Sequence, residues 1–195
     1  MLRSSRVFTR LEYRLAAHIM NAPWLDGSAH KKRLTLHLVR RCANAGHVDA
    51  LSLYGLMLFR DGGSARDRAV GVRYVIRAAE AGHPDSQYQL GHIYEHGCKQ
   101  FARREDRAVT WYARAAEAGH AEAAERLSRA FGHGELGLPI DPERSLGWRL
   151  SGSAAEESRT LEERQLQERS PVTETSAGAT LDRRRRPAAL ARQSL

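Results

Sequence analysis

The sequence predicts an all-α fold: an α–α superhelix, that is, a solenoid of antiparallel helix pairs with three clear repeats and a degenerate N-terminal one. The main observation is the tripeptide Ala-Gly-His, which recurs at residues 45–47, 81–83 and 118–120, 36 and then 37 residues apart. A period of this length is typical of stacked helix pairs. The composition agrees, because aromatic residues are scarce at 7% and alanine, a strong helix former, is abundant.

The second repeat shows why each unit should fold as a helix pair. Gly82 is suited to end one helix, because glycine accepts a positive φ, and Pro84 is suited to open the next, where its missing N–H is harmless. Gly97 should end this new helix. The residues that recur at helical spacing within it, and should form its buried face, are Ser86, Leu90, Gly91 and Tyr94.

The second helix of this repeat should begin near Glu105 and Asp106, because acidic side chains suit the positive end of the helix dipole. Gly119 should end it. Its expected apolar stripe consists of Ala108, Trp111, Tyr112, Ala115 and Ala116. Gly91 in the facing helix should let the two backbones approach closely, with Trp111 filling the space beside the contact as a core residue.

The flanking units keep this pattern with drift. In the first unit the matching residues are Ala50, Tyr54, Gly55, Leu58, Tyr74, Ala78 and Ala79, and in the third they are Ala123, Leu127, Ser128, Phe131, Gly134, Ser145 and Trp148. The sequence therefore predicts an N-terminal cap or degenerate repeat at residues 1–44 and a solenoid at residues 45–156. Residues 157–195 should form a charged helix extension followed by a disordered basic tail, because the tail has too few apolar residues to offset the entropy of ordering.

The run Ala-Gly-His-Pro-Asp-Ser-Gln-Tyr-Gln-Leu-Gly-His-Ile-Tyr-Glu-His-Gly at residues 81–97 resembles the Sel1-like repeat, a relative of the tetratricopeptide repeat. The likeness continues through the second helix and covers residues 45–153. It implies a superhelix with a concave groove. Members of this family generally act as protein-interaction adaptors, in bacteria often linked to host interaction or stress. A few cysteine-rich members are linked to hydrolysis of β-lactams, but this chain lacks their cysteine pattern. The resemblance thus implies a non-enzymatic adaptor that holds a peptide or helix of another protein.

The resemblance also implies that the first helix of each repeat lines the groove. The candidate partner-binding residues are Ser52, Phe59 and Arg60 in the first repeat, Tyr88, His92, Glu95 and His96 in the second, and Glu125, Arg129 and His133 in the third. Leu56 and Gly132 occupy two further matching places. Aromatic, imidazole and charged side chains of this kind are suited to recognising a bound segment of another protein.

The net charge of +8 is concentrated at the two ends of the chain. Residues 1–44 hold nine Lys and Arg against two acids, residues 45–156 hold fourteen against fifteen, and residues 157–195 hold eight against six. Neutral repeats argue against a solenoid built for nucleic acid. The alternative function is a nucleic-acid or anionic-membrane accessory protein that binds through its basic termini. The run Arg183–Arg186 is then either a binding element or part of a solvated tail.

Two groups of histidines could carry chemistry, and for both we favour a structural role. His92 and His96, four residues apart, could share a metal ion with Cys98, but the pattern lacks the glutamate of a zinc-protease helix. Solvated or groove-facing rings are the favoured alternative. The histidine of each Ala-Gly-His turn should hydrogen-bond a helix end, because repeats keep equivalent residues far apart. We therefore expect no catalytic residues, no metal and no cofactor.

The remaining sequence features concern the compartment and the N-terminus. Cys42 and Cys98 fall in different repeats and are expected to be free thiols in a reducing compartment. No apolar run approaches the roughly 18 residues that cross a bilayer, so we expect a cytoplasmic protein. The N-terminal segment should form an amphipathic helix, with a weak likeness to an organelle transit sequence as the alternative. The apolar face of that helix would consist of Val7, Phe8, Leu11, Leu15 and Ile19.

Overall fold

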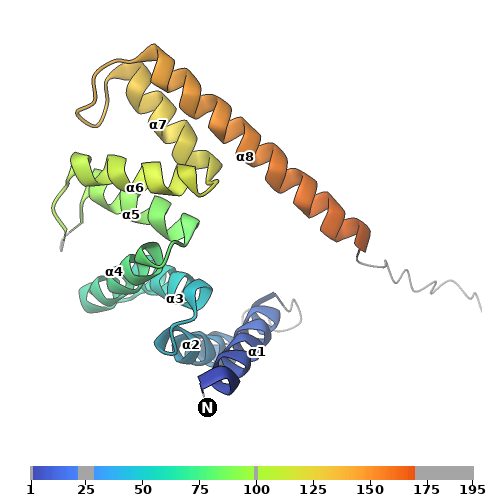
Figure 1. The fold of residues 1–195 in the computed structure, drawn as a ribbon. Helices are drawn as coiled ribbons and strands as arrows, with labels where there is room; N and C mark the ends of the chain where they lie inside the picture. Colours follow the sequence, from blue (N-terminus) through green and yellow to red (C-terminus); the bar gives the residue numbers. More distant parts are fainter. Residues whose placement is uncertain (1, 22–28, 99–100, 170–195) are drawn as a thin grey trace, which may run out of the picture.

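The computed structural model describes residues 2–21, 29–98 and 101–169 (Figure 1). Within these ranges the chain is helical, and one isolated bridge joins Cys98 and Phe101 in the loop after α5. The helices are α1 (Leu2–Asn21), α2 (Ala29–Asn44), α3 (Val48–Asp61), α4 (Ala65–Glu80), α5 (Pro84–His96), α6 (Glu105–Glu117), α7 (Ala121–His133) and α8 (Pro142–Arg169). The expected tail, with Arg183–Arg186, lies outside the described residues.

Successive helices pack as pairs: α1 with α2, α3 with α4, α5 with α6, and α7 with α8. Each pair contacts the next through α2 and α3, α4 and α5, or α6 and α7. Figure 1 shows the pairs following one another along a curved path, from the N-terminal pair to the α7–α8 pair. The prediction of an all-α solenoid of helix pairs is confirmed.

The Ala-Gly-His turn joins one repeat to the next, as the sequence predicts. Gly46, Gly82 and Gly119 have φ values of 84°, 89° and 88°, a left-handed conformation that glycine adopts without strain. In the second of these turns, the N–H of His83 donates to the carbonyl of Ala78 at 3.0 Å. This bond satisfies a carbonyl at the end of α4 while the chain reverses into the next helix.

The core consists of two buried clusters and is built mainly from alanine and leucine. One buried cluster consists of Val75, Ala79, Leu90, Tyr94, Ala108, Tyr112, Ala115, Ala116, Ala123, Ala124, Leu127, Ala130 and Leu136. A second, nearer the N-terminus, consists of Ala16, Val39, Cys42, Ala43, Ala50, Leu51, Tyr54 and Ala78. The buried face predicted for α5 is confirmed, since Ser86, Leu90, Gly91 and Tyr94 are all buried. Small residues let the helices pack closely.

The structure corrects the core position assigned to Trp111. Its side chain is only half-buried, and the guanidinium carbon of Arg114 lies 4.7 Å from the ring centroid. Tyr112 occupies the core instead and is 1% exposed. The apolar stripe predicted for α6 is otherwise correct. The two neighbouring aromatic residues point in directions about 100° apart on the helix, so only one of them can face α5.

A second correction concerns the apolar face of α1. Leu11 and Leu15, two of the residues predicted to form this face, are 55% and 53% exposed. The side chains of Val7, Phe8 and Ile19 lie outside the described part of the structure. The helix instead turns its smaller residues toward α2: Ala16 is fully buried, and the thiol of Cys42 lies 3.6 Å from the carbonyl of Thr9. Close contact between the two helices requires these smaller side chains, which leaves the leucines facing outward.

At the other end of the solenoid, α8 is much longer than the helices of the repeats. It continues to Arg169, through the region where a charged extension was expected. Leu146 and Leu150 on α8 are 45% and 60% exposed. Figure 1 shows the last turns of α8 projecting away from the other helices. In the part of the chain that the structure describes, no helix is both long enough and apolar enough to span a membrane.

Candidate functional site

The first helices of the three repeats place two rows of equivalent residues at or near the surface. One row consists of Arg60, His96 and His133. These residues lie in the last turns of α3, α5 and α7 and are all exposed. The second row lies one helical turn earlier and consists of Leu56, His92 and Arg129. His92 and Arg129 are exposed and Leu56 is half-buried. We call these six residues the first-helix rows.

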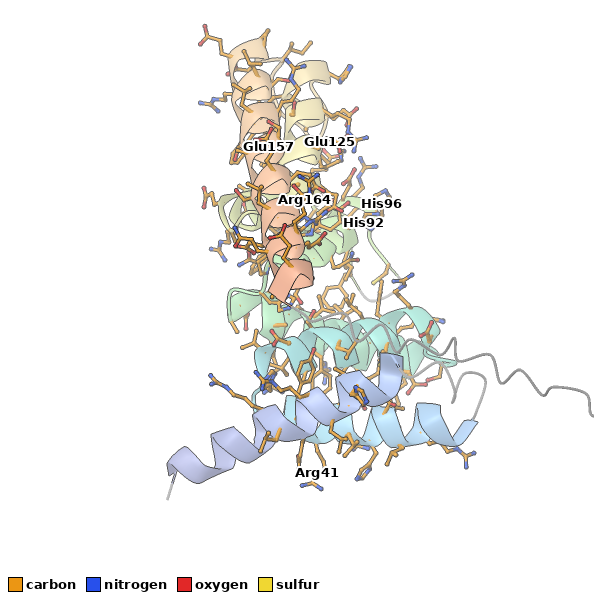
Figure 2. All side chains as sticks on the ribbon, turned by 90° about the vertical axis from the view of Figure 1, so that its right-hand side faces the viewer. Arg41, His92, His96, Glu125, Glu157 and Arg164 are labelled. Atoms are coloured by element: carbon orange, nitrogen blue, oxygen red, sulfur yellow. The ribbon has the colours of Figure 1, made fainter. Side chains whose placement is uncertain are left out.

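His92 and His96 lie against each other on α5 (Figure 2). Their ring centroids are 4.2 Å apart, and Nδ1 of His96 donates to the carbonyl oxygen of His92 at 3.1 Å. Partial burial, and next the neighbouring His96, lower the pKa of His92. The His92 ring is therefore neutral at pH 7 and can present a polarisable face to a partner. Among the described residues, no group of three or more His, Cys, Asp or Glu side chains could hold a metal ion.

Glu95, a predicted groove residue, is held inside the protein by its neighbours. The hydroxyl of Tyr112 donates to Oε2 of Glu95 at 2.6 Å, and Arg126 of α7 donates to both of its carboxylate oxygens. The side chains of Glu95 and Arg126 are only 13% and 14% exposed. Burial alone would raise the pKa of Glu95, but the hydrogen bonds from Arg126 and Tyr112 outweigh it and hold the pKa below its usual value. This carboxylate joins the second repeat to the third.

The other predicted groove residues differ in how far they are exposed to a partner. Ser52 is 4% exposed and so offers no surface to a partner. Tyr88 stacks on His120 of the next turn, with ring centroids 4.5 Å apart. Phe59 is half-buried. Glu125 is exposed and lies 3.9 Å from Arg129 on the same helix, an ion pair that leaves both side chains accessible.

The turn histidines hydrogen-bond helix ends, as the sequence predicts, in two of the three repeats. Nδ1 of His83 accepts from the N–H of Ser86, and Nδ1 of His120 accepts from the N–H of Ala123. Both histidines cap the start of their helix in this way. His47 makes no such bond, and its Nδ1 has no hydrogen-bond partner in the described part of the chain.

The same histidines also approach an acidic residue of the preceding repeat, which sequence reasoning missed. Nε2 of His83 lies 3.7 Å from a carboxylate oxygen of Asp49, and Nε2 of His120 lies 3.6 Å from one of Asp85. The sequence does contain a sign of this contact, because an aspartate is the second residue of both α3 and α5. Only the stacking of the repeats shows that each aspartate faces the next turn.

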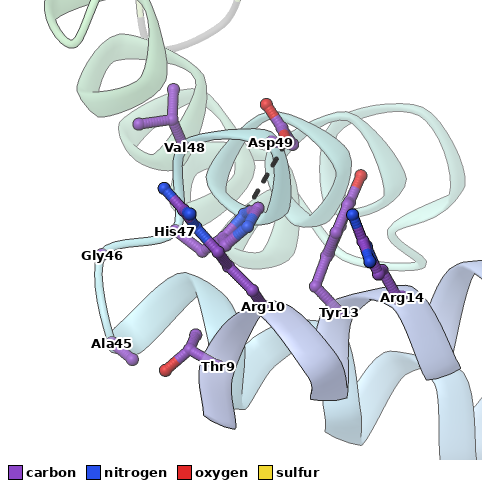
Figure 3. A pocket seen from close by; sticks show the side chains of 9 residues that line it. All are labelled: Thr9, Arg10, Tyr13, Arg14, Ala45, Gly46, His47, Val48 and Asp49. Atoms are coloured by element: carbon purple, nitrogen blue, oxygen red, sulfur yellow. Dashed lines mark ion pairs between the residues drawn. The ribbon is translucent and has the colours of Figure 1, made fainter. Parts of the chain in front are cut away.

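A hollow of about 880 Å³ lies between α1 and the turn that joins α2 to α3 (Figure 3). Its lining residues are Thr9, Arg10, Tyr13, Arg14, Ala45, Gly46, His47, Val48 and Asp49. The rings of Tyr13 and His47 stack at 4.6 Å. This contact repeats that between Tyr88 and His120, so α1 lies against the first turn much as α5 lies against the third. The spacing of Arg10 and Arg14 in the sequence places both on one helix face, but it does not predict that the turn at residues 45–49 lies opposite them.

The stacked helix pairs and the glycine turns between them define a tetratricopeptide-like α-solenoid. The Sel1 repeat family model matches residues 48–83, 84–120 and 121–149, which together are more than half of the chain. The protein therefore belongs to the Sel1 repeat family. This confirms the resemblance seen in the sequence. No curated protein matches the chain.

Two solved structures show the same fold. A Sel1 repeat protein from Oxalobacter formigenes superposes with a TM-score of 0.65 at 21% identity, over 75% of this chain and 58% of the other. The protein c5321, a protective antigen of uropathogenic Escherichia coli strains, superposes with a TM-score of 0.63 at 23% identity, over 84% and 36%. This chain thus spans less than two thirds of either relative.

Proposed function

We propose that the protein is a non-enzymatic adaptor that binds a peptide or helix of another protein through the first-helix rows. Sel1 repeats are generally protein-interaction modules, and the chain carries three of them. The observation that carries the proposal is the exposure of equivalent residues on successive repeats. Arg60, His96 and His133 are accessible although their neighbours Phe59 and Glu95 are partly covered or held by other repeats.

The chemistry of the rows favours a partner segment that carries both apolar and acidic groups. The stacked rings of His92 and His96 form a flat surface, and Arg129 of the next repeat adds a positive charge. An extended or helical segment laid along successive repeats would meet these groups one after another. Of the ten predicted partner-binding residues, we retain Arg60, His92, His96, Glu125, Arg129 and His133. Phe59 and Tyr88 would contribute only at the edge of the surface.

The test is affinity purification of the intact protein from its native cells, followed by mass spectrometry. The double variant His92→Ala, Arg129→Ala should lose the partners that the wild-type protein recovers. The matched control is Arg73→Ala, since Arg73 is exposed on α4, away from the first helices. Equal recovery by the wild type and the double variant would overturn the proposal. The alternative is an accessory protein that binds nucleic acid or anionic membranes through its basic termini. That function would be favoured if salt releases the recovered partners and if added nucleic acid or anionic vesicles displace them.

A further inference from the structure

We propose that the hollow between α1 and the α2–α3 turn is a second binding site, which takes a single carboxylate from an acidic segment of a partner protein. The site uses none of the residues in the first-helix rows, so it goes beyond the proposed adaptor surface and can be tested separately. Figure 3 shows Arg10, Tyr13 and Arg14 extending from α1 toward His47 and Asp49.

The two arginines supply the positive charge of the hollow. Arg10 and Arg14 are exposed, one helical turn apart on α1, and neither has an ion pair with another described residue. The nearest acidic residue of their own helix, Glu12, is held by Arg41 of α2 at 2.8 Å. The guanidinium groups are therefore available to a ligand. Arginine is well suited to this role, because its planar fork of donors matches the two oxygens of a carboxylate.

Asp49 limits the charge of the ligand. It lies at the edge of the hollow, 55% exposed, with a carboxylate oxygen 3.9 Å from Nδ1 of His47 and another 3.7 Å from Nε2 of His83. Arg10, Arg14 and Asp49 together give the lining one net positive charge from these three side chains. A monoanion such as a carboxylate neutralises this charge, whereas a phosphate dianion would leave the hollow with one net negative charge beside the carboxylate of Asp49.

The wall and size of the hollow favour a peptide over a small ion. The stacked rings of Tyr13 and His47, 4.6 Å apart, form a rigid wall beside the arginines. A volume of about 880 Å³ accommodates several side chains, and ligand sites of this size commonly combine such walls with a few charged groups. An acidic side chain could thus meet the arginines while neighbouring residues of the same segment lie against the rings.

The test uses the full chain, isotopically labelled, and two blocked peptides as probes in an NMR titration: acetyl-Ala-Glu-Ala-amide and acetyl-Ala-Gln-Ala-amide. The glutamate peptide should shift the amide signals of Gly46, His47 and Asp49. The glutamine peptide should bind at least about tenfold more weakly, because it lacks the charge. Inorganic phosphate, as a third probe, should also bind more weakly than the glutamate peptide. Equal binding of the two peptides, or tighter binding of phosphate, would overturn the proposal.

Variants separate this site from the adaptor surface. Arg10→Gln with Arg14→Gln should weaken binding of the glutamate peptide at least about tenfold without unfolding the chain, because both side chains are exposed and neither has an ion pair with another described residue. The control Arg66→Gln with Arg73→Gln removes the same charge from exposed positions of α4 and should change nothing. His92→Ala with Arg129→Ala should also leave this affinity unchanged. Unchanged affinity in the first variant, or an equal loss in either of the others, would show that the carboxylate binds elsewhere.

Discussion

The aromatic ring of Tyr112 in α6 lies against the backbone of Gly91 in α5, where a Cβ atom would stand only 2.7 Å from Cδ1 of the ring. The matching glycine of the first repeat meets backbone instead. A Cβ at Gly55 would lie 2.8 Å from the backbone nitrogen of Val75, the counterpart of Tyr112, and 3.0 Å from the carbonyl of Gly71. Both repeats therefore require glycine at this position. In the first repeat Gly55 leaves room for the backbone of α4, and in the second Gly91 leaves room for the ring of Tyr112.

Replacing Gly91 with alanine should lower the free energy of unfolding by up to about 2 kcal/mol. Overpacking against Tyr112 costs about 1–3 kcal/mol, and the better helix propensity of alanine returns only about 1 kcal/mol. Gly91→Leu should be more damaging. Urea unfolding followed by circular dichroism measures both. The control is Gly147→Ala in α8, where a Cβ meets nothing within 4 Å. If Gly91→Ala proves as stable as Gly147→Ala, the contact with Tyr112 is wrongly placed.

Tyr112 should contribute far more to stability than Trp111, although tryptophan is the larger residue. Tyr112→Ala should cost about 3–5 kcal/mol, because the side chain is almost fully buried and leaves a cavity. Trp111→Ala should cost only about 1–2 kcal/mol, since its ring is half-buried and packs partly under Arg114. Thermal or urea unfolding of the two variants in parallel checks the order. A larger loss for Trp111→Ala would contradict the orientation of α6.

The folded state should lose stability as His120 becomes protonated. Burial lowers the pKa of His120, an effect that Glu122 and Asp85 partly oppose. The unfolded chain therefore binds a proton at higher pH than the folded chain does. The free energy of unfolding is therefore not reduced by His120 above about pH 6.5, the pKa of histidine in the unfolded chain. It declines as the pH falls from there toward the lower pKa that His120 has in the folded chain. Protonation would also remove the lone pair of Nδ1 that accepts from Ala123.

Urea unfolding between about pH 7.5 and pH 5 measures this effect. His120→Gln should flatten the fall in unfolding free energy over that range, because the substituted side chain does not titrate. The control is His133→Gln on α7, since His133 is exposed. A pH dependence that is the same in His120→Gln as in the wild type would contradict this account.

The repeat architecture can be predicted from local features of the sequence alone. The period of 36 and 37 residues set the number of repeats, and the glycine of each Ala-Gly-His turn set where one helix ends and the next begins. These features depend on local chemistry: positive φ at glycine, proline at the start of α5, and apolar residues at helical spacing. Each acts within a few residues of chain, so it can be predicted without the neighbouring repeats.

Which side chains remain at the surface depends on how the repeats pack against one another. Glu95 and Arg129 look equally available in the sequence, yet Glu95 is held by Arg126 and Tyr112 while Arg129 is exposed. Likewise, nothing near Arg10 in the chain indicates the turn at residues 45–49 that completes the hollow. These outcomes depend on how far each helix rotates about its axis and on contacts between residues 17 or more positions apart in the sequence. Local periodicity does not fix that rotation, because a shift of one residue turns a side chain by about 100°.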